Sequence, residues 1–477
     1  MNQQELATCH CIISHPSKPK FLTVRHSDNW SPPIVRFPPE GGLVAKAKLI
    51  TDGVMNKYGF KTTVLRHLKS SPKYHCIELE MQSAKSSKKL QAVWVGSREY
   101  AKYRSSSRRQ FDPFAAWLKE QEAGRVPALR PPWEQKAWFN SASLWMQHQL
   151  NRLNVQVTGS VEQFRAFRTA SSILRVPTSQ GMVYFKASFD HPPLEAPLTK
   201  ALAQRWPGHV PAPLAIDDER NWMLSMDYGN RDKHRLQWSD YPSIARVLAQ
   251  IQRESLDSIT QWQELACPVQ ELEQLSGFIA GFDQLAGVLS EGGGIALSTE
   301  EIDRLGRMSD RLQASCSSLA EFSIPNMLVH PDVWFANLHS RDEGWLITDW
   351  SGTVISHPFF SVLKLIRFRE LWSSQAEGGD GPLAPNGSTL AISNESDEKL
   401  TIAILGAYLE RFEEFESRDR LNEAMALARE LEGAWRLFKW QQAIAREEYE
   451  SVGYQKIARY LQRISREMIT SSLSDLT

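Results

Sequence analysis

The sequence lacks an excess of charge of either sign, because 55 basic residues stand against 55 acidic ones in a chain of 477. A chain without a net field has no general means of attracting nucleic acid or an acidic membrane surface, so we expect neither as a partner. The sequence also lacks an apolar run of the roughly 18 residues that suggest a membrane span, and its N-terminus has no signal-peptide pattern. We therefore expect a soluble, cytoplasmic protein.

Cysteine is scarce as well, with five residues in the whole chain. Only Cys9 and Cys11 lie close together, on either side of His10. A strand would turn both thiols to one face, but no second pair of ligands follows at a spacing typical of zinc sites. We therefore expect small, buried strand residues with reduced thiols rather than a metal site.

The length exceeds what one hydrophobic core usually holds, so several domains are expected. Alternating apolar residues predict strands from residue 7 onward, and a proline-rich linker follows at 124–133. A second strand-rich block begins near Val155, and helical patterns predominate from Pro242. We predict an α+β protein with a first domain at 1–140, a strand-rich region with a connecting helix at 141–230, and a helical region at 231–477.

A set of polar residues near residue 330 has the spacing that phosphoryl transfer requires. Asp332 and Asn337 lie five residues apart, and Asp349 follows at the end of a predicted strand. Such a reaction needs a carboxylate to orient the acceptor and take its proton, and metal ions to neutralise charge on the triphosphate. We predict Asp332 as the base, and Asn337 and Asp349 as hard oxygen ligands for magnesium. His330 is expected to support the loop by hydrogen bonds.

These residues resemble a known family. His330-x-Asp332-x4-Asn337, with Asp349-Trp350 after it, is similar to the H-G-D-x4-N and I-D-W motifs of aminoglycoside phosphotransferases and choline kinases. The resemblance covers about residues 155–470 and implies a two-lobed, protein-kinase-like fold with a strand-rich small lobe and a helical large lobe. Pro331 departs from the family, because proline replaces its usual small residue and restricts the loop backbone.

The resemblance also implies a nucleotide site that uses ATP and Mg2+. Lys186 inside a strand and Glu195 at the start of the next helix are similar in placement to the ion pair that holds the triphosphate in kinases. The alternative for Lys186 is a charge that protects a strand edge. The remaining predicted nucleotide contacts are the phosphate-loop counterpart Thr169–Ser172, with Ser171 and Ser172, and the hinge residues Met226 and Tyr228.

The first domain resembles a Nudix fold in its order of strands and in the segment Arg36–Gly42 before a helix. A working Nudix helix binds magnesium through clustered glutamates. The stretch Leu43–Lys57 has Lys46, Lys48 and Asp52 but no glutamate. We predict a degenerate Nudix-like α/β domain without diphosphate hydrolysis, the alternative being an unrelated α+β module. Ligand sensing, homodimer formation and capping of the kinase site are all open as its role.

The predicted function is an ATP-dependent phosphotransferase acting on a hydroxyl or amine of a small metabolite, antibiotic or natural-product intermediate. One alternative is a nucleotide-binding pseudokinase or scaffold, which Pro331 and the glycine-poor phosphate loop favour. Another is nucleotidyl transfer. The acidic run Glu410–Glu416 and the pair Glu447-Glu448 either attract a cationic acceptor or are solvated helix faces.

Overall fold

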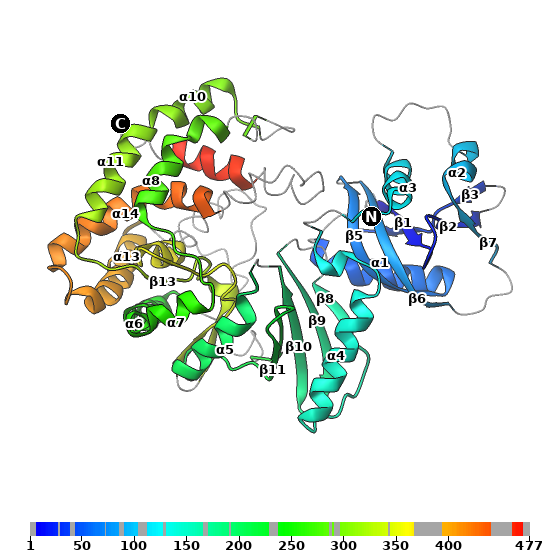
Figure 1. The fold of residues 1–477 in the computed structure, drawn as a ribbon, viewed down its shortest axis with the longest axis horizontal. Helices are drawn as coiled ribbons and strands as arrows, with labels where there is room; N and C mark the ends of the chain where they lie inside the picture. Colours follow the sequence, from blue (N-terminus) through cyan, green and yellow to red (C-terminus); the bar gives the residue numbers. More distant parts are fainter. Residues whose placement is uncertain are drawn as a thin grey trace. The chain divides into compact units, whose positions relative to one another are not determined.

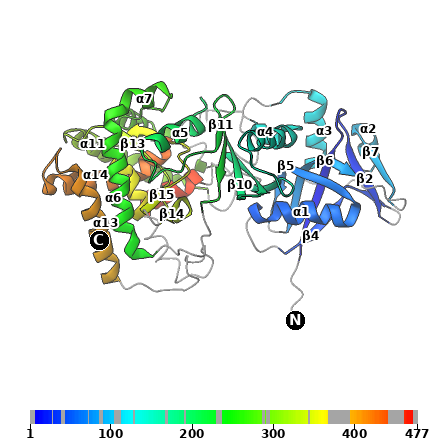
Figure 2. The ribbon, with the colours of Figure 1, turned by 90° about the horizontal axis from the view of Figure 1, so that it is seen from below.

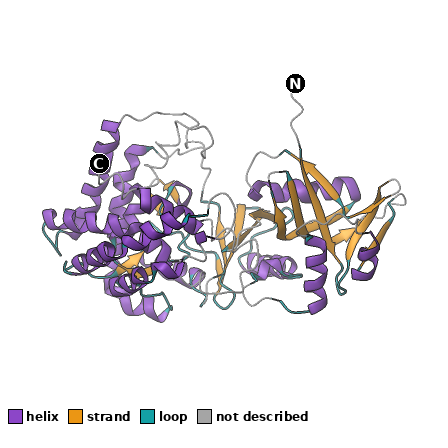
Figure 3. Ribbon diagram, turned by 90° about the horizontal axis from the view of Figure 1, so that it is seen from above, coloured by secondary structure: helices purple, strands orange, loops and turns teal. Residues whose placement is uncertain are grey.

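The structure, a computed structural model, forms two compact units that meet in the chain at Phe189 and Asp190. Strands predominate in the first and helices in the second (Figure 3), which confirms the predicted mixed α+β class. The domain boundaries predicted near residues 140 and 230 stay predictions. The described residues are 6–26, 29–38, 43–71, 73–84, 90–103, 112–126, 130–165, 170–189, 192–228, 237–285, 289–290, 296–341, 344–366, 394–439 and 460–470.

The first unit is built on a seven-stranded sheet, drawn in blue in Figure 1. Its main order is β3-β2-β1-β6-β5, with β4 also pairing with β1 and β7 with β2. The central strands β1 and β6 run parallel, and the other pairings are antiparallel. The strands are β1 (Ala7–Ser14), β2 (Phe21–His26), β3 (Asn29–Ser31), β4 (Ile34–Phe37), β5 (Phe60–Ser70), β6 (Tyr74–Ala84) and β7 (Ala92–Val95).

Helix α1 (Leu43–Tyr58) runs across one side of this sheet (Figure 2). Its buried residues Ala47, Ile50 and Val54 recur every three or four positions, which places them on one helical face. They share a core cluster with Cys9 and Cys11 of β1. The helix ends because Gly59 takes a left-handed φ of 76° and its N–H bonds to the carbonyl of Met55.

Helix α3 (Pro113–Ala123) packs against the opposite side of the sheet, beside the short helix α2 (Ser97–Tyr103). The Asp112 side chain caps its N-terminus, and Pro113 begins it with a backbone angle already suited to a helix. Phe114 and Trp117 pack on Ile12 of β1. The alternation along β1 therefore sends the cysteines to α1 and Ile12 to α3, so the thiols are small core residues, as predicted.

Three antiparallel strands complete the first unit: β8 (Glu162–Arg165), β9 (Ser171–Thr178) and β10 (Gly181–Ser188). Helix α4 (Trp138–Arg152), which follows a 3-10 turn at Pro132–Glu134, packs on β10 through the rings of Trp138 and Phe185. The Gln163 amide bonds to both the N–H and the C=O of Val64 at 2.7 and 2.9 Å. One side chain thus completes the backbone bonding of β5 and joins the two sheets of this unit.

The second unit is mainly helical, and four of its strands form two-stranded sheets. Strand β13 pairs with β16, and β14 forms a hairpin with β15. No helix among the described residues is both long and apolar enough to cross a membrane. Its elements are α5 (Glu195–Arg205), β11 (Ala215–Asp217), β12 (Trp222–Met226), α6 (Tyr241–Ser255), α7 (Ile259–Glu264), α8 (Leu272–Ala280), α10 (Thr299–Arg307), α11 (Ser309–Ala320), β13 (Met327–Val329), β14 (Leu338–Arg341), β15 (Gly344–Ile347), β16 (Val354–Ser356), α13 (Asn394–Leu409) and α14 (Arg418–Lys439), with further helical residues at 359–366 and 460–470 and 3-10 turns at Trp238–Asp240, Leu256–Ser258, Phe282–Leu285, Phe335–Asn337 and Glu410–Phe412.

A buried glutamine fixes the strand from which the polar loops begin. Gln252 on α6 is 1% exposed, and its amide nitrogen donates to the carbonyls of Leu328 and Pro358, both at 3.0 Å. Its amide oxygen accepts from the Tyr408 hydroxyl at 2.6 Å. A buried polar group whose bonds are all made holds its partners in one geometry. Gln252 therefore ties β13, the segment before the 359–366 helix and α13 to α6.

Candidate active site

The predicted catalytic residues lie on two loops of the second unit, one after β13 and one after β15. The first loop leaves β13 after the buried Val329 and reaches a 3-10 turn at Phe335–Asn337, which leads directly into β14. The second loop follows β15 and carries Asp349. Because β13 pairs with β16 just beyond Asp349, and β14 pairs with β15 just before it, both loops are held in one place.

His330 joins the two loops. Its Nδ1 accepts from the backbone N–H of Asp332, and its Nε2 lies 3.1 Å from the carbonyl of Thr348. Because Nδ1 accepts, the proton sits on Nε2 and is donated to Thr348. The ring is fully buried, and this burial lowers its pKa and keeps it neutral near pH 7. His330 therefore supports the loop backbone, as predicted.

Asp332 and Asn337 contact each other directly. The Asn337 amide nitrogen lies 2.9 Å from the Asp332 carbonyl and 3.3 Å from its Oδ2. The Asn337 carbonyl accepts from the backbone N–H of Thr348 at 2.9 Å. The five-residue spacing thus closes a compact loop and attaches it to the strand before Asp349. Since the amide nitrogen faces Asp332, the amide oxygen of Asn337 is the end that can bind a cation.

Asp349 has an uncommon backbone conformation. Its φ is 65°, in the left-handed region that few residues other than glycine and asparagine or aspartate adopt. The Ser351 hydroxyl donates to Asp349 Oδ1 at 2.6 Å. Trp350 is buried beneath, with its ring edge-on to His330 and its Nε1 bonded to the Ile347 carbonyl. A strained turn fixed by buried neighbours is often found at functional sites.

The oxygen donors of these loops fit magnesium bound together with phosphate. Mg2+ is usually held by one or two carboxylates plus phosphate oxygens and water, and Asn337 and Asp349 offer that kind of donor. Within the described residues no group of three or more His, Cys, Asp or Glu side chains could hold a metal by itself.

Two lysines close to these loops were not predicted from the sequence. Lys364, in the helix at 359–366, places its Nζ 3.3 Å from Asp332 Oδ1. Lys439, the last residue of α14, lies so close to Gly352 that a Cβ there would be 2.9 Å from its Nζ. Neither contact was predictable from the motif, because both lysines lie on helices that follow it in the chain.

The predicted nucleotide contacts divide between the two units. In the first unit, Lys186 lies on β10 opposite Ile173, and Ser171 and Ser172 are the first residues of β9, with little exposure. Thr169 lies outside the described residues. Roles for these side chains in phosphate binding stay predictions.

In the second unit, Glu195 begins α5 and is buried, and Met226 ends β12. The ring of Tyr228 lies edge-on to His339 with centroids 5.3 Å apart. His339 belongs to β14, two residues beyond Asn337, so Tyr228 lies beside the strand that follows the catalytic loop. The contacts of Met226 and Tyr228 with a base, and the ion pair of Lys186 with Glu195, stay predictions.

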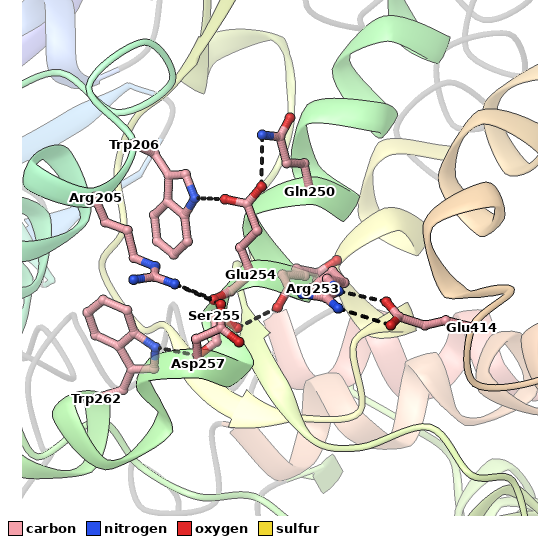
Figure 4. A network of polar contacts seen from close by, with 10 residues as sticks. Arg205, Trp206, Gln250, Arg253, Glu254, Ser255, Asp257, Trp262 and Glu414 are labelled. Carbon is pink, nitrogen blue, oxygen red and sulfur yellow. Dashed lines mark hydrogen bonds and ion pairs between the residues drawn. The ribbon is translucent and has the colours of Figure 1, made fainter.

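The acidic run Glu410–Glu416 is neutralised by arginines. Arg253 of α6 reaches Glu414 with two bonds of 2.6 and 3.0 Å, within the wider polar network of Arg205, Trp206, Glu254 and Asp257 in Figure 4. The other pairs are Arg246–Glu410, Arg418–Glu413 and Arg420–Glu416. Each of the four glutamates in this run therefore has an arginine partner. Glu447 and Glu448 lie outside the described residues.

No family model matches the sequence, and no curated protein matches it either. Solved structures of small-molecule kinases match the fold of this chain. A type I macrolide 2'-phosphotransferase is 12% identical, with 67% of this chain and 96% of its own covered and a TM-score of 0.41. An ethanolamine kinase from Plasmodium vivax is 12% identical (76% and 97% covered, TM-score 0.42), and a choline kinase from Cryptosporidium parvum 11% identical (66% and 90%, 0.44).

These solved structures are of the kinds of protein that the motif at Asp332 resembles, as predicted. Identities of 11–12% and TM-scores of 0.41 to 0.44 leave activity and substrate to be argued from the residues of this chain.

Proposed function

We propose that this protein is an ATP-dependent phosphotransferase that acts on a hydroxyl or amine of a small molecule. One observation carries the proposal: Asp332, Asn337 and Asp349 lie on two loops that the buried His330 joins by bonds at both ring nitrogens. A base and hard oxygen ligands in a fixed relation supply what phosphoryl transfer needs from a protein, namely position and charge.

Each residue has a role in this proposal. Asp332 orients the acceptor and takes its proton. Asn337 and Asp349 hold magnesium, which when bound neutralises charge on the triphosphate. Lys186, oriented by Glu195, holds the triphosphate. The contacts proposed for the rest of the nucleotide come from Ser171, Ser172, Met226 and Tyr228.

The test is a nucleotide-consumption screen. The full chain is incubated with ATP and Mg2+ and a library of metabolites and antibiotics, and the products are searched by mass spectrometry for the gain of one phosphate. Magnesium-dependent transfer to at least one compound is expected. Absence of both nucleotide binding and turnover would contradict the proposal.

A second candidate, a nucleotide-binding pseudokinase or scaffold, is favoured by a specific contact. Lys364 lies against one oxygen of the predicted base, and Pro331 restricts the loop beside it. Nucleotide binding with no transfer in the same screen would select this candidate.

For the first domain we propose a degenerate Nudix-like module without hydrolytic activity. The only acidic residue of α1, Asp52, has its carboxylate 3.2 Å from the ammonium of Lys48. A lone carboxylate paired with a lysine is a poor magnesium site. A cytoplasmic location and a homodimer through this domain belong to the same proposal.

A further inference from the structure

The two oxygens of Asp332 face different partners. Oδ2 lies 3.3 Å from the amide nitrogen of Asn337, a residue whose amide oxygen is a proposed metal ligand. Oδ1 lies 3.3 Å from the ammonium of Lys364. The carboxylate thus has one oxygen turned toward the metal side of the site and the other toward a cation. Since a base must meet its acceptor on the side that the metal ligands leave open, Lys364 stands on the acceptor side.

The helix that carries Lys364 is rigidly held. Phe359 and Phe360 are buried, and Phe360 stacks on Trp435 of α14 at 4.9 Å with an interplanar angle of 8°. Phe359 packs edge-on against Tyr408 of α13. This packing fixes where the lysine stem begins, so the position of its ammonium next to Asp332 follows from the core of the unit.

The ion pair itself is open to solvent, because the side chain of Lys364 is 26% exposed and that of Asp332 is 43% exposed. Pairs as accessible as this contribute little to stability, since water screens both charges. Stability alone therefore does not account for a lysine beside the predicted base. An accessible ammonium can instead exchange its partner for an anion that arrives from solvent.

The surroundings do not favour a cationic acceptor. The run Glu410–Glu416, which would be the source of an attracting negative field, is paired with arginines of α6 and α14. With that field cancelled and a lysine next to the base, a positively charged acceptor would meet like charge close to Asp332.

We propose that the acceptor carries an anionic group, a carboxylate or a phosphate, and that Lys364 binds it. The proposal rests on the phosphotransferase function above and names its substrate class. Lys364 releases Asp332 to pair with the anion. The acceptor hydroxyl then loses its proton to Asp332, and its oxygen forms a bond to the γ-phosphorus. The bond from that phosphorus to the β–γ bridging oxygen breaks, and ADP leaves with that oxygen.

The experiment uses four probes of similar shape and different charge: glycerol 3-phosphate, glycerate, glycerol and 3-aminopropane-1,2-diol. Phosphate transfer from ATP to each is measured by mass spectrometry with the full chain, beside nucleotide turnover. We expect one of the two anionic probes to have a kcat/KM at least about 10-fold above those of the neutral and cationic probes, since a charge-assisted bond is worth roughly that factor. The better of the two shows whether a phosphate or a carboxylate is recognised.

Variants then test Lys364 itself. Lys364→Met should lower kcat/KM for the preferred anion about 10-fold or more through KM, Lys364→Arg should restore part of it, and Lys364→Glu should favour the aminodiol. Lys200→Met, which removes an exposed lysine of α5, is the matched control and should change nothing. Melting temperatures of all variants show that they fold.

Preference for the cationic probe, or an anion preference that survives in Lys364→Met, overturns the inference. Nucleotide turnover without transfer to any probe also counts against an acceptor selected by its charge, while leaving the phosphotransferase proposal in place. Loss of all nucleotide binding and turnover in the parent protein removes the proposed function and this inference together.

Discussion

Each unit brings a carboxylate and a cation together, and the two arrangements differ in burial. In the first unit, Arg66 bonds to Glu78 at 2.7 Å, with side chains that are 7% and 3% exposed. Arg66 also makes two bonds to Glu120, which accepts a further bond from Arg130. In the second unit, Asp332 and Lys364 form one contact of 3.3 Å and remain partly exposed.

The difference distinguishes a network with a structural role from a pair to which we assign a function. In the buried network, Arg66 bridges β5, β6 and α3 through its bonds to Glu78 and Glu120. Partial burial by itself would raise the pKa of Glu120, but Arg130 and Arg66 lower it to about 2. The pair at Asp332 has a single contact and is accessible to solvent, which suits groups that must change partners during a reaction.

The largest effect on activity is expected at Asp349, which lies in the second unit on the loop after β15. Asp349→Ala removes a hard ligand and its charge, so magnesium-dependent nucleotide turnover should be abolished. The fold should persist, because the loop is anchored through Trp350 and His330. Turnover assays and circular dichroism check both statements. Turnover like that of the parent would remove Asp349 from the metal site.

In the buried network, Arg66→Met should lower the free energy of unfolding of the first unit by about 3–5 kcal/mol, because it leaves Glu78 buried without its partner. Urea titration with hydrogen exchange on β5 and β6 measures the loss. Adding Glu78→Gln to the variant should recover part of it, since the unpaired charge is then gone. A loss below about 1 kcal/mol would mean that the network is not structural.

In contrast to Arg66→Met, Asp332→Asn should damage catalysis rather than stability. General-base contributions are about 100- to 10,000-fold, so transfer should fall at least about 100-fold, or about 2.7 kcal/mol. Nucleotide affinity and the melting temperature should change little, because other residues bind nucleotide and the ion pair is exposed.

The combined readout for Asp332→Asn is diagnostic. If nucleotide binding and catalysis are lost together, Asp332 is a metal ligand or a structural residue. If transfer is undiminished, Asp332 has no part in the mechanism, and the main reason for a kinase function is gone.

Local patterns in the sequence predicted much of this. Alternating spacing predicted strands from residue 7, where β1 begins, and α1 follows Arg36–Gly42, where a helix was expected. The predicted support of the loop by His330 is confirmed by its bond to the N–H of Asp332. Such features depend on residues that are near one another in the chain.

Long-range pairs were not predictable in this way. Lys364 meets Asp332 because Gln252 of α6 bonds both to β13 and to the segment before the 359–366 helix. Two glutamates of the acidic run, Glu410 and Glu414, find their partners only because α6 brings Arg246 and Arg253 to them. A charged side chain has no periodicity that names its partner, so its role becomes visible only in the folded chain.

The second unit should lose stability in mild acid. Burial lowers the pKa of His357 in the second unit to about 3 from an ordinary 6.5. Because the unfolded chain binds the proton more readily than the folded one, His357 makes the folding stability depend on pH. The stability is complete above about pH 6.5 and falls as the pH drops, by about 2 kcal/mol at pH 5. The lowered pKa of His330 acts in the same direction.

Hydrogen exchange of α6 peptides at pH 7.5, 6 and 5 measures this loss. His357→Gln should remove most of the slope between pH 6.5 and 5 in the second unit. In the first unit, Glu120 loses its contribution only as the pH falls from about 4.5 toward about 2. Protection of α6 that is the same at pH 7.5 and pH 5 would contradict this assignment.

The smallest effect is expected at Asp52 in α1, whose side chain is exposed like that of Asp332. Its partner Lys48 is one turn away in the same helix, and such pairs contribute about 0.2–0.5 kcal/mol. Asp52→Asn should therefore change stability by no more than that, and nucleotide turnover by the full chain should be unchanged, because a single carboxylate does not hold a catalytic magnesium. Lys48→Gln is the matched control and should have the same small effect. Magnesium-dependent hydrolysis of nucleoside diphosphate derivatives by the parent, lost in Asp52→Asn but kept in Lys48→Gln, would show that the first unit has an active site of its own and that an exposed, singly paired carboxylate suffices for it.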